Sequence, residues 1–340
     1  RRPQDTPAVI AMHADARLAA IQRWLPGLLG DDFALAPASA DASFRRYFRA
    51  VTGTGSFIVM DAPPDKEDCR PFIHAAAAFG ARGLNVPRVL HADLSQGLLL
   101  LTDLGARTYL GELNDDSADA LYGDALHALL TLQRGGADPG FPPYDEALLM
   151  REMALFPDWL LHRHLGLALG AAQRAVLQRA FALLAASALE QPRVWVHRDY
   201  HSRNLMVTEN ANPGVLDFQD AVIGPLTYDL VSLLRDCYIR WPAPRVESWM
   251  AGHFVRLRDA GVLGTETDLA RFRRWFDLMG VQRHLKAIGI FARLNHRDGK
   301  PGYLADIPRT LAYVLEVSGR YPELRDLRRL LEACGLAQPR

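Results

Sequence analysis

The stretch Val196-His-Arg-Asp-Tyr-His-Ser-Arg-Asn-Leu205 is the most informative part of this sequence of 340 residues. Twelve residues after Leu205, a short apolar run ends in Asp217-Phe218. Written as a pattern, the two segments are H-R-D-x-x-x-x-N followed by D-F. Asp and Asn are also common turn residues and helix caps, but the apolar run that ends in D-F favours a functional site over ordinary turns.

These residue types suit phosphoryl transfer. A hydroxyl that accepts a phosphoryl group needs a carboxylate to orient it and take its proton, and Asp199 fits that role. The phosphates of a nucleotide need Mg²⁺, which prefers oxygen ligands. Asn204 and Asp217 supply an amide and a carboxylate oxygen from two adjacent turns, as in the catalytic and metal-binding loops of kinases. We therefore expect Asp199 to be catalytic and Asn204 and Asp217 to bind the metal.

Other interpretations of the same region are weaker. His197 and His201 lie four residues apart, and His162 and His164 lie two apart, but no H-E-x-x-H motif or cysteine cluster completes a zinc site. Ser202 is not in a G-x-S-x-G turn, which disfavours a serine hydrolase. A protein kinase is disfavoured as well, because no A-P-E segment follows the D-F dipeptide.

Composition excludes several classes of protein. Hydrophobic residues make up 49% and charged residues 23%, which is ordinary for a globular chain with a large core. The 39 basic and 39 acidic residues balance, so no net field favours nucleic acid or a membrane surface. Three widely spaced cysteines predict reduced thiols. With no apolar leader in residues 1–20 and no apolar run of about 18 residues, we expect a soluble, cytoplasmic, monomeric protein without nucleic-acid or membrane partners.

The chain changes character near residue 105. Two strand signals, residues 44–51 and 56–61, flank the Gly-containing connection 52–55 of a hairpin. After residue 105 the apolar spacing is mostly helical, with a long helix expected at Ala171–Leu189 and three brief strands at 194–197, 205–208 and 215–218. We therefore predict an α+β protein with a small β-rich domain, residues 1–104, and a larger, mostly helical domain, residues 105–340.

The first domain is expected to hold the nucleotide. Ser39, Asp41 and Ser43 lie between an apolar stretch and a strand, where small residues let backbone N–H groups approach phosphates. The segment lacks glycine, so alone it would be taken for an ordinary turn. Asp103 and Leu104 stand at the joint between the two domains, where the backbone can hydrogen-bond adenine.

One expected cation is missing from this domain. The kinase template places a lysine on the third strand, but Met60 occupies that position, and a thioether cannot balance phosphate charge. Arg45, Arg46 or Arg49 of the preceding strand can replace it. Alternation along a strand puts Arg45 and Arg49 on one face and Arg46 on the other. The sequence leaves open which arginine faces the nucleotide; Arg46 is our candidate.

The chain resembles the aminoglycoside phosphotransferase and choline kinase-like superfamily, whose fold is bilobal and protein-kinase-like. Four segments are closest to one branch, the anomeric sugar kinases of peptidoglycan recycling: SADASFRRYFR (39–49), VMDAPP (59–64), WVHRDYHSRNLM (195–206) and GVLDFQDAVIGPLTYDLVSLLRD (214–236). The resemblance implies ATP and Mg²⁺ as cofactors, and N-acetylmuramate or N-acetylglucosamine phosphorylated at C1. It also implies that Asp229 braces the catalytic loop.

The candidate sugar contacts are inferred from residue type and from closeness to the motif. Recognition of a sugar uses carboxylates, amides and an aromatic face, and an arginine also suits the lactyl carboxylate of N-acetylmuramate. Four residues are candidates alongside Asp199: Gln219, Asp220, Arg235 and Trp159. A tryptophan at a helix start is more often a core residue than a ligand.

Two further functions stay open. A kinase of an aminoglycoside or of another small hydroxylated molecule has the same motif, but residues 271–340 contain more Arg and Lys than acids, which disfavours a polycationic substrate. A non-catalytic nucleotide-binding scaffold is suggested by Met60. The intact set Asp199, Asn204 and Asp217 argues against it.

Overall fold

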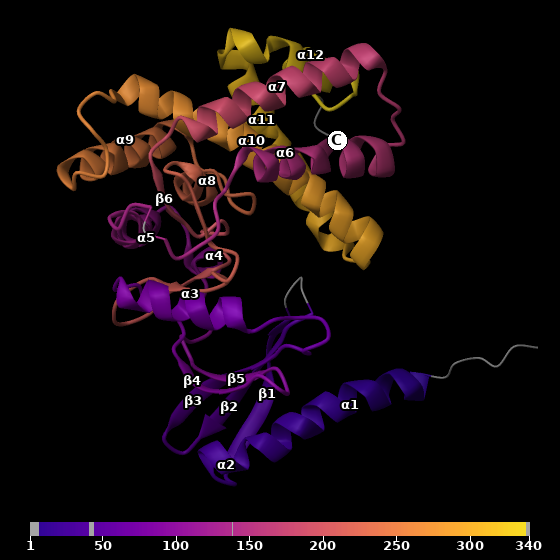
Figure 1. Ribbon diagram of the computed structural model, residues 1–340, viewed down its shortest axis with the longest axis vertical. Coiled ribbons are helices and arrows are strands. Elements are labelled where there is room, and N and C mark those ends of the chain that lie inside the picture. Colours follow the sequence, from indigo (N-terminus) through magenta and orange to yellow (C-terminus); the bar gives the residue numbers. More distant parts are fainter. Residues whose placement is uncertain (1–6, 41–43, 138, 338–340) are drawn as a thin grey trace, which may run out of the picture. The chain divides into compact units, whose positions relative to one another are not determined.

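The computed structural model describes residues 7–40, 44–137 and 139–337, and the chain forms two compact units (Figure 1). The first unit comprises Arg1–Gly80 and Val86–Gly105, and the second comprises Ala81–Asn85 and Ala106–Arg340. The sequence analysis placed the division at residues 104 and 105. The predicted fold class, a β-rich part followed by a larger helical part, is confirmed.

The first unit is an antiparallel sheet with the strand order β1-β2-β3-β5-β4. Its elements are α1 (Pro7–Trp24), α2 (Pro26–Leu29), β1 (Phe33–Ala40), β2 (Arg46–Thr52), β3 (Gly55–Asp61), α3 (Arg70–Ala81), β4 (Val89–Asp93) and β5 (Leu98–Thr102). Thr52 pairs with Gly55 at the tip of β2 and β3. The predicted hairpin is therefore confirmed.

One face of this sheet forms the core of the first unit. Ile21 of α1 and Leu25, which follows the end of α1, pack in a cluster with Phe48, Ala50 and Val59 of the sheet. Successive residues of a strand point to opposite faces, so alternate positions of β2 enter this core. Residues that pair directly across two strands share a face, and Met60 pairs with Tyr47. Met60 and Tyr47 therefore lie on the other face.

The second unit is built around one long helix. Its helices are α4 (Tyr109–Glu112), α5 (Ala118–Gln133), α6 (Glu146–Leu155), a π-helix (Phe156–His164), α7 (Ala171–Leu189), α8 (Tyr228–Leu234), α9 (Ala243–Asp259), α10 (Leu269–Asp298), α11 (Ile307–Arg320), α12 (Arg325–Ala333) and 3₁₀ turns at Pro301–Asp306 and Pro322–Leu324. Helix α10 packs against α6, α7, α8 and α11. A Cβ at Gly289 would lie 2.4 Å from the backbone of Leu155, so glycine lets α10 approach the end of α6.

Two short ladders lie beside these helices. Strand β6 (Arg193–Val196) pairs with β9 (Val222–Pro225), and β7 (Leu205–Met206) pairs with β8 (Gly214–Val215). The expected strand over 215–218 is wrong beyond Val215, because Asp217 adopts a left-handed φ of 62° that a strand cannot continue through. Strand β9 was not predicted, since four residues containing Gly and Pro show no alternation.

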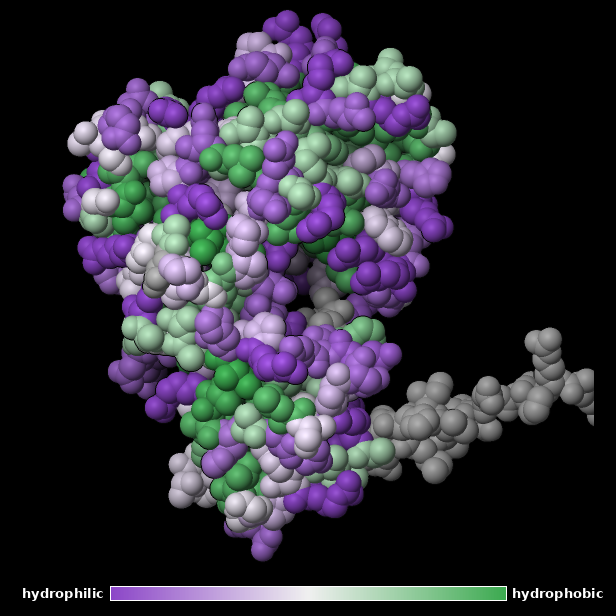
Figure 2. All heavy atoms as spheres, viewed as in Figure 1, coloured by the Kyte–Doolittle hydropathy of each residue, from purple (hydrophilic) through white to green (hydrophobic). Residues whose placement is uncertain are grey.

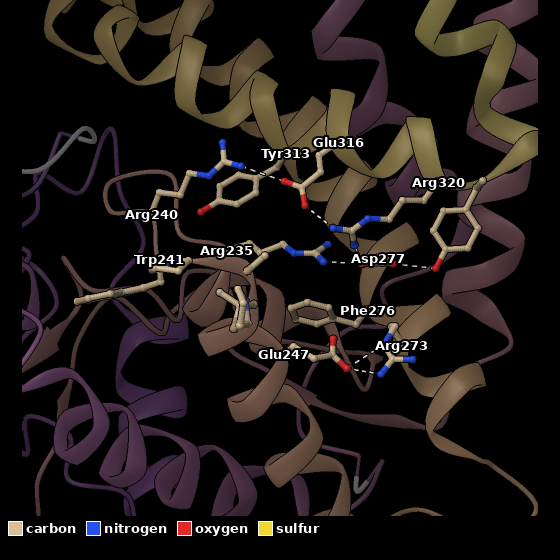
Figure 3. Close-up of a pocket in the computed structure, with 15 residues that line it drawn as sticks. Arg235, Arg240, Trp241, Glu247, Arg273, Phe276, Asp277, Tyr313, Glu316 and Arg320 are labelled. Atoms are coloured by element: carbon tan, nitrogen blue, oxygen red, sulfur yellow. Dashed lines mark hydrogen bonds and ion pairs between the residues drawn. The ribbon is translucent and has the colours of Figure 1, made fainter.

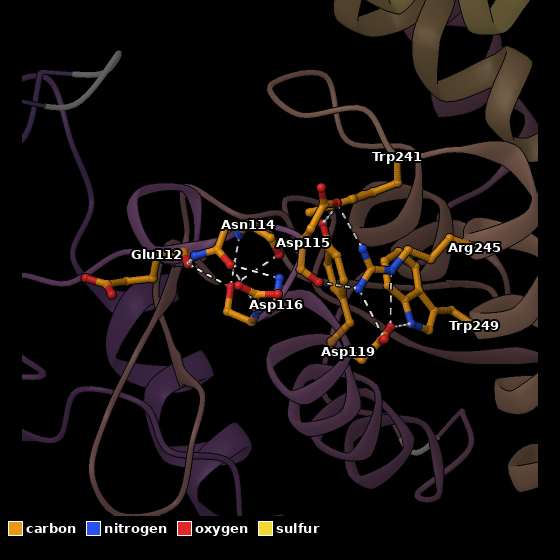
Figure 4. Close-up of polar contacts among 10 residues, drawn as sticks. Glu112, Asn114, Asp115, Asp116, Asp119, Trp241, Arg245 and Trp249 are labelled. Carbon is orange, nitrogen blue, oxygen red and sulfur yellow. Dashed lines mark hydrogen bonds and ion pairs between the residues drawn. The ribbon is translucent and has the colours of Figure 1, made fainter.

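Helix α9 is attached to the start of α5 by polar contacts that Figure 4 shows. Arg245 forms ion pairs with Asp115 and Asp119 at 3.3 and 3.1 Å, and the Trp249 indole donates to Asp119 at 2.9 Å. Exposed ion pairs contribute about 0–1 kcal/mol each. The buried hydrogen bond from the Trp241 indole to the Tyr122 hydroxyl, 2.9 Å, therefore stabilises this corner more.

The visible surface is mixed in character. Figure 2 shows hydrophilic residues interspersed with apolar ones over both units. No helix among the described residues combines the length and apolar character that crossing a membrane requires.

Candidate active site

The backbone before Asp199 is fixed by a buried carboxylate. After β6 ends at Val196, the backbone N–H groups of His197 and Arg198 donate to Asp229 at 2.6 and 2.9 Å. Arg198 adopts a left-handed φ of 79°, a conformation that costs energy in a residue other than glycine. Burial raises the pKa of Asp229 to about 7, although these two N–H groups act in the opposite direction. The predicted brace of the loop is thus in direct contact with it.

The segment after Asp199 is held as firmly. Asp236 accepts hydrogen bonds from the backbone N–H and the hydroxyl of Ser202, at 2.9 and 2.5 Å. The Tyr200 hydroxyl donates to the carbonyl of Ala125 at 2.8 Å. His197 is fully buried, and its Nε2 lies 2.9 Å from the carbonyl of Leu216, which links the catalytic loop to the turn that carries Asp217. Neither side of Asp199 is free to move independently.

The structure brings Asp199, Asn204 and Asp217 together. The amide nitrogen of Asn204 donates to the carbonyl of Asp199 at 3.0 Å and to the carboxylate of Asp217 at 3.3 Å. The backbone N–H of Leu216 donates to the carbonyl of Asn204 at 2.9 Å. The three residues that the motif predicted therefore form one hydrogen-bonded group.

The donor set of this group fits Mg²⁺. Because the nitrogen of the Asn204 amide is engaged, its oxygen is the atom left to bind a cation, next to the Asp217 carboxylate. Gln219 donates to Asp217 at 2.7 Å, while its own Oε1 is buried without a hydrogen-bond partner. A carboxylate, an amide oxygen and an orphaned amide oxygen are the hard oxygen ligands that Mg²⁺ takes.

Asp199 is ionised at neutral pH. Burial raises its pKa, but Lys286, His201, Arg283 and Arg198 together lower it to about 2. Arg198 and Lys286 both form ion pairs with Glu152, the second at 3.1 Å. With so low a pKa, Asp199 is a weak proton acceptor. It suits a reaction in which the acceptor hydroxyl is first oriented and loses its proton late, as in phosphoryl transfer with a loose transition state.

A small cavity opens beside Asp199, with a volume of about 90 Å³. It lies within the second unit and is lined by Asp199, His201, Tyr228, Cys237, Tyr238, Arg283, Lys286, Ala287, Ile290 and Phe291. Sequence analysis missed Arg283 and Lys286, which come from α10. Basic residues on a long helix most often face solvent, and only their positions among the apolar residues of α10 could have indicated burial.

The predicted sugar contacts are dispersed in the second unit. Gln219 is bonded to Asp217, and Asp220 is exposed, with its carbonyl 3.3 Å from the Arg198 guanidinium. Trp159 lies in the π-helix, where the Arg163 guanidinium is 5.9 Å from its ring. Neither Asp220 nor Trp159 lines the cavity beside Asp199.

Arg235 lies in a different cavity from Asp199. That cavity has a volume of about 680 Å³ and is bounded by residues of α9, α10 and α11 (Figure 3). Arg235 is buried there and forms an ion pair with Asp277 at 2.5 Å. The structure therefore does not bring Arg235 to the Asp199 group.

The residues predicted to bind the nucleotide lie in the first unit. Asp41 and Ser43 are outside the described residues, and the backbone of Ser39 pairs with Tyr47 at the end of β1. Asp103 accepts hydrogen bonds from the Arg49 guanidinium at 2.6 Å and from the N–H of Gly105 at 2.9 Å. Leu104, between them, is half-buried. The Asp103 carboxylate is thus engaged in shaping the turn.

Strand register separates the two arginines of β2, Arg46 and Arg49. Arg46 pairs with Asp61 in register, and its guanidinium forms an ion pair with the Asp61 carboxylate. Arg46 and Asp61 lie on the face of the sheet opposite Met60. Arg49 pairs with Ile58, which is two residues from Met60 on the same strand, so Arg49 lies on the Met60 face. A guanidinium on the Met60 face is therefore supplied by Arg49, while Arg46 points away from the position that a strand lysine would occupy.

Comparison with known proteins places the chain among phosphotransferases. Residues 34–275 match the phosphotransferase enzyme family. An N-acetylmuramate/N-acetylglucosamine kinase of Pseudomonas putida is 50% identical over 328 residues, which cover 93% of this chain and 96% of the relative. A protein of the same name from Neisseria meningitidis is 45% identical over 317 residues, covering 92% and 94%.

Solved structures share the fold at low sequence identity. The choline kinase LicA from Streptococcus pneumoniae has a TM-score of 0.61 at 13% identity, covering 88% of this chain and 99% of that one. The ADP-bound aminoglycoside phosphotransferase APH(2'')-Ib has a TM-score of 0.57 at 16% identity, covering 88% and 98%. The chain belongs to the phosphotransferase enzyme family, and the resemblance that the catalytic-loop motif and its flanking segments predicted is confirmed.

Proposed function

We propose that the protein is an ATP-dependent sugar kinase that phosphorylates the anomeric hydroxyl of N-acetylmuramate and N-acetylglucosamine, giving the 1-phosphate, in cell-wall recycling. The observation that carries this proposal is the 50% identity to a kinase of that name over 93% of the chain. The hydrogen-bonded group of Asp199, Asn204 and Asp217 supports it, since a phosphotransferase needs a base and metal ligands at one place.

Asp199 acts on the acceptor sugar. Its carboxylate accepts a hydrogen bond from the anomeric hydroxyl and directs the oxygen towards the γ-phosphorus of ATP. An anomeric hydroxyl is more acidic than other sugar hydroxyls, so a positioned carboxylate of low basicity suffices as general base. Because the loop is anchored at Asp229 and Asp236, the carboxylate keeps its orientation during the reaction.

Asn204 and Asp217 would hold Mg²⁺, and Gln219 orients the Asp217 carboxylate. A Mg²⁺ ion held there would neutralise the charge of the nucleotide phosphates. In the first unit we propose that the segment of Ser39, Asp41 and Ser43 covers the phosphates and that the backbone at Asp103 and Leu104 binds adenine. Arg49, on the Met60 face, is a better candidate than Arg46 for the missing lysine.

An aminoglycoside is a less suitable acceptor. The cavity beside Asp199 contains the cationic side chains of Arg283 and Lys286, which repel a polycation. A scaffold without catalytic activity is also disfavoured, because it would not need the bonds that join Asn204 to Asp199 and Asp217.

The experiment is ATP-dependent phosphorylation of N-acetylmuramate, N-acetylglucosamine, glucose and kanamycin, with the linkage determined by phosphorus NMR. We expect sugar 1-phosphates from the N-acetylated sugars and loss of product in Asp199→Asn. Turnover of kanamycin alone would identify an antibiotic kinase. Binding of ATP with no turnover of any acceptor would exclude the proposed function.

A further inference from the structure

The cavity beside Asp199 is too small for a whole sugar. Binding sites for entire small molecules occupy about 300–1,000 Å³, whereas this cavity measures about 90 Å³. It is therefore sized for one substituent of a larger ligand. Because Asp199 forms part of its wall, that substituent must lie close to the reacting hydroxyl.

The cavity contains a buried cation with no good partner. Arg283 is 5% exposed, and its Nε has no hydrogen-bond partner. Its Nη1 is 3.7 Å from the sulfur of Cys237, a weak acceptor, and burial raises the pKa of that thiol, which keeps it neutral. A buried donor left without a partner is energetically costly. A ligand oxygen would satisfy it.

A second residue of the cavity wall, His201, also has an unsatisfied atom. The Nδ1 of His201 is buried without a hydrogen-bond partner. A neutral imidazole can accept a hydrogen bond at one ring nitrogen. The cavity thus offers one unsatisfied donor and one atom able to accept.

The rest of the wall is apolar. Arg283, Ala287 and Ile290 are spaced by four and three residues on α10, so they lie on one face of the helix, and Phe291 adjoins them. The cavity therefore combines a donor, an acceptor and a patch that fits a small alkyl group. An acetamido group has the complementary set, which is a carbonyl oxygen, an N–H and a methyl.

We propose that this cavity is the subsite for the 2-acetamido group of the acceptor, with Arg283 donating to the acetyl oxygen, His201 accepting from the amide N–H, and Ala287 and Ile290 contacting the methyl. The inference rests on the proposed function, in which Asp199 holds the anomeric hydroxyl. C2 is bonded directly to the anomeric carbon, so its substituent is the one that reaches a cavity beside Asp199. N-Acetylmuramate and N-acetylglucosamine share this group and differ at C3.

The test compares kcat/KM for glucose, N-acetylglucosamine and N-butanoylglucosamine in the wild-type protein and three variants. We expect the wild type to favour N-acetylglucosamine over glucose by about 100-fold, because glucose leaves the polar atoms of the cavity unsatisfied. Ala287→Leu fills the cavity, so this preference falls about tenfold or more. Ile290→Ala enlarges the cavity, so the ratio of N-butanoylglucosamine to N-acetylglucosamine rises about tenfold.

Ala270→Leu is the matched control, since it makes the same change at an exposed position of the same helix. It should leave all substrate ratios unchanged. Ratios of kcat/KM within one variant are independent of how much protein has folded. Wild-type turnover of sugars with no dependence on the acyl group, or equal loss on all sugars in Ala287→Leu, would overturn the subsite and leave the kinase. Absence of any sugar phosphorylation would overturn both.

Discussion

The two cavities of the second unit differ in size and in how their charges are balanced. In the cavity of about 680 Å³, all four lining arginines are ion-paired: Arg235 with Asp277, Arg240 and Arg320 with Glu316, and Arg273 with Glu247 (Figure 3). In the cavity of about 90 Å³, no ion pair to another described residue satisfies Arg283, which contacts the Cys237 thiol.

The comparison shows that unbalanced charge, rather than volume or the number of unsatisfied atoms, distinguishes the cavity beside Asp199. The larger cavity has two orphaned atoms, Arg235 Nη1 and the Tyr313 hydroxyl, but its cations have carboxylate partners within the chain. The smaller cavity contains Asp199, whose pKa is lowered to about 2 against the effect of burial. Strongly shifted pKa values and unpaired buried cations are typical of functional sites.

Replacing the carboxylate of the smaller cavity should have the largest effect. Asp199→Asn keeps the size of the side chain but removes its ability to take a proton, so we expect kcat to fall by about 10³–10⁴-fold. Steady-state kinetics with N-acetylglucosamine measures it, and ATP binding by calorimetry should be unchanged. A loss below tenfold would mean that Asp199 is not the base.

The second prediction compares the replacement of one arginine from each cavity. Arg283→Gln removes the cation of the smaller cavity and should lower kcat/KM for N-acetylglucosamine about 10–100-fold. Arg320→Gln removes a half-exposed ion pair of the larger cavity and should change kcat/KM less than about twofold. Urea unfolding of both variants controls for stability. If Arg283→Gln does not fold, Arg283→Lys keeps the charge and should show a smaller loss in the same direction.

Equal activity losses in the two variants would remove the distinction between the cavities. The pH dependence gives a second readout. Arg283 lowers the pKa of Asp199, so its removal should raise that pKa and move the acid limb of kcat/KM to higher pH. Arg320→Gln should leave the acid limb where it is in the wild type.

The sequence predicted the part of the site that is local in the chain. Asp199, Asn204 and Asp217 lie within 19 residues and are joined by short turns, so their types and spacing predict that they meet. Arg283 joins them from α10, more than 60 residues further along the chain, and no local pattern distinguishes it from the exposed arginines of that helix. Tertiary packing places it, so sequence reasoning chose Arg235, which is closer in sequence but faces the other cavity.

The fold was predictable for a similar reason. The helix at Ala171–Leu189 is rich in alanine and leucine, and the hairpin of β2 and β3 has a Gly-containing connection. Both local signals agree with the structure. Strand pairing is not local, and it decides which face each arginine of β2 occupies. Alternation separates Arg46 from Arg49, but only the register with β3 shows that Arg46 lies with Asp61 and away from Met60.

A third prediction concerns Asp236, which holds two backbone segments near Asp199. Asp236 binds Ser202 of the catalytic loop and also accepts from the N–H of Tyr238, which lines the smaller cavity. Asp236→Asn leaves one acceptor oxygen for two sets of donors, so we expect kcat to fall about tenfold, with KM for the sugar raised. Steady-state kinetics that determine kcat and the KM of each substrate separately measure this effect. A change in KM for ATP alone would contradict the role assigned to Asp236.

The smallest effect is expected from acid titration of a histidine near the larger cavity. His284 stacks on Tyr313 at a ring distance of 4.8 Å, and its Nε2 lies 2.8 Å from the carbonyl of Arg235. Burial lowers its pKa to about 3, with Arg283 and Arg235 acting in the same direction and the hydrogen bond to Arg235 opposing it. The unfolded chain, with a histidine pKa near 6.5, binds a proton that the folded state rejects.

Because the folded pKa of His284 is the lower one, its contribution to stability is complete above about pH 6.5 and is lost as the pH falls towards 3. Replacing it by Gln, which can still donate to the Arg235 carbonyl, should reduce the loss of stability between pH 7 and pH 5 by about 2 kcal/mol. Urea unfolding at the two pH values measures this difference. The variant should keep wild-type kcat at neutral pH, because His284 contacts Tyr313 and Arg235 of the cavity whose cations are already paired, and does not line the cavity beside Asp199. A large loss of kcat would show that the two cavities are coupled, and the distinction drawn between them would then no longer hold.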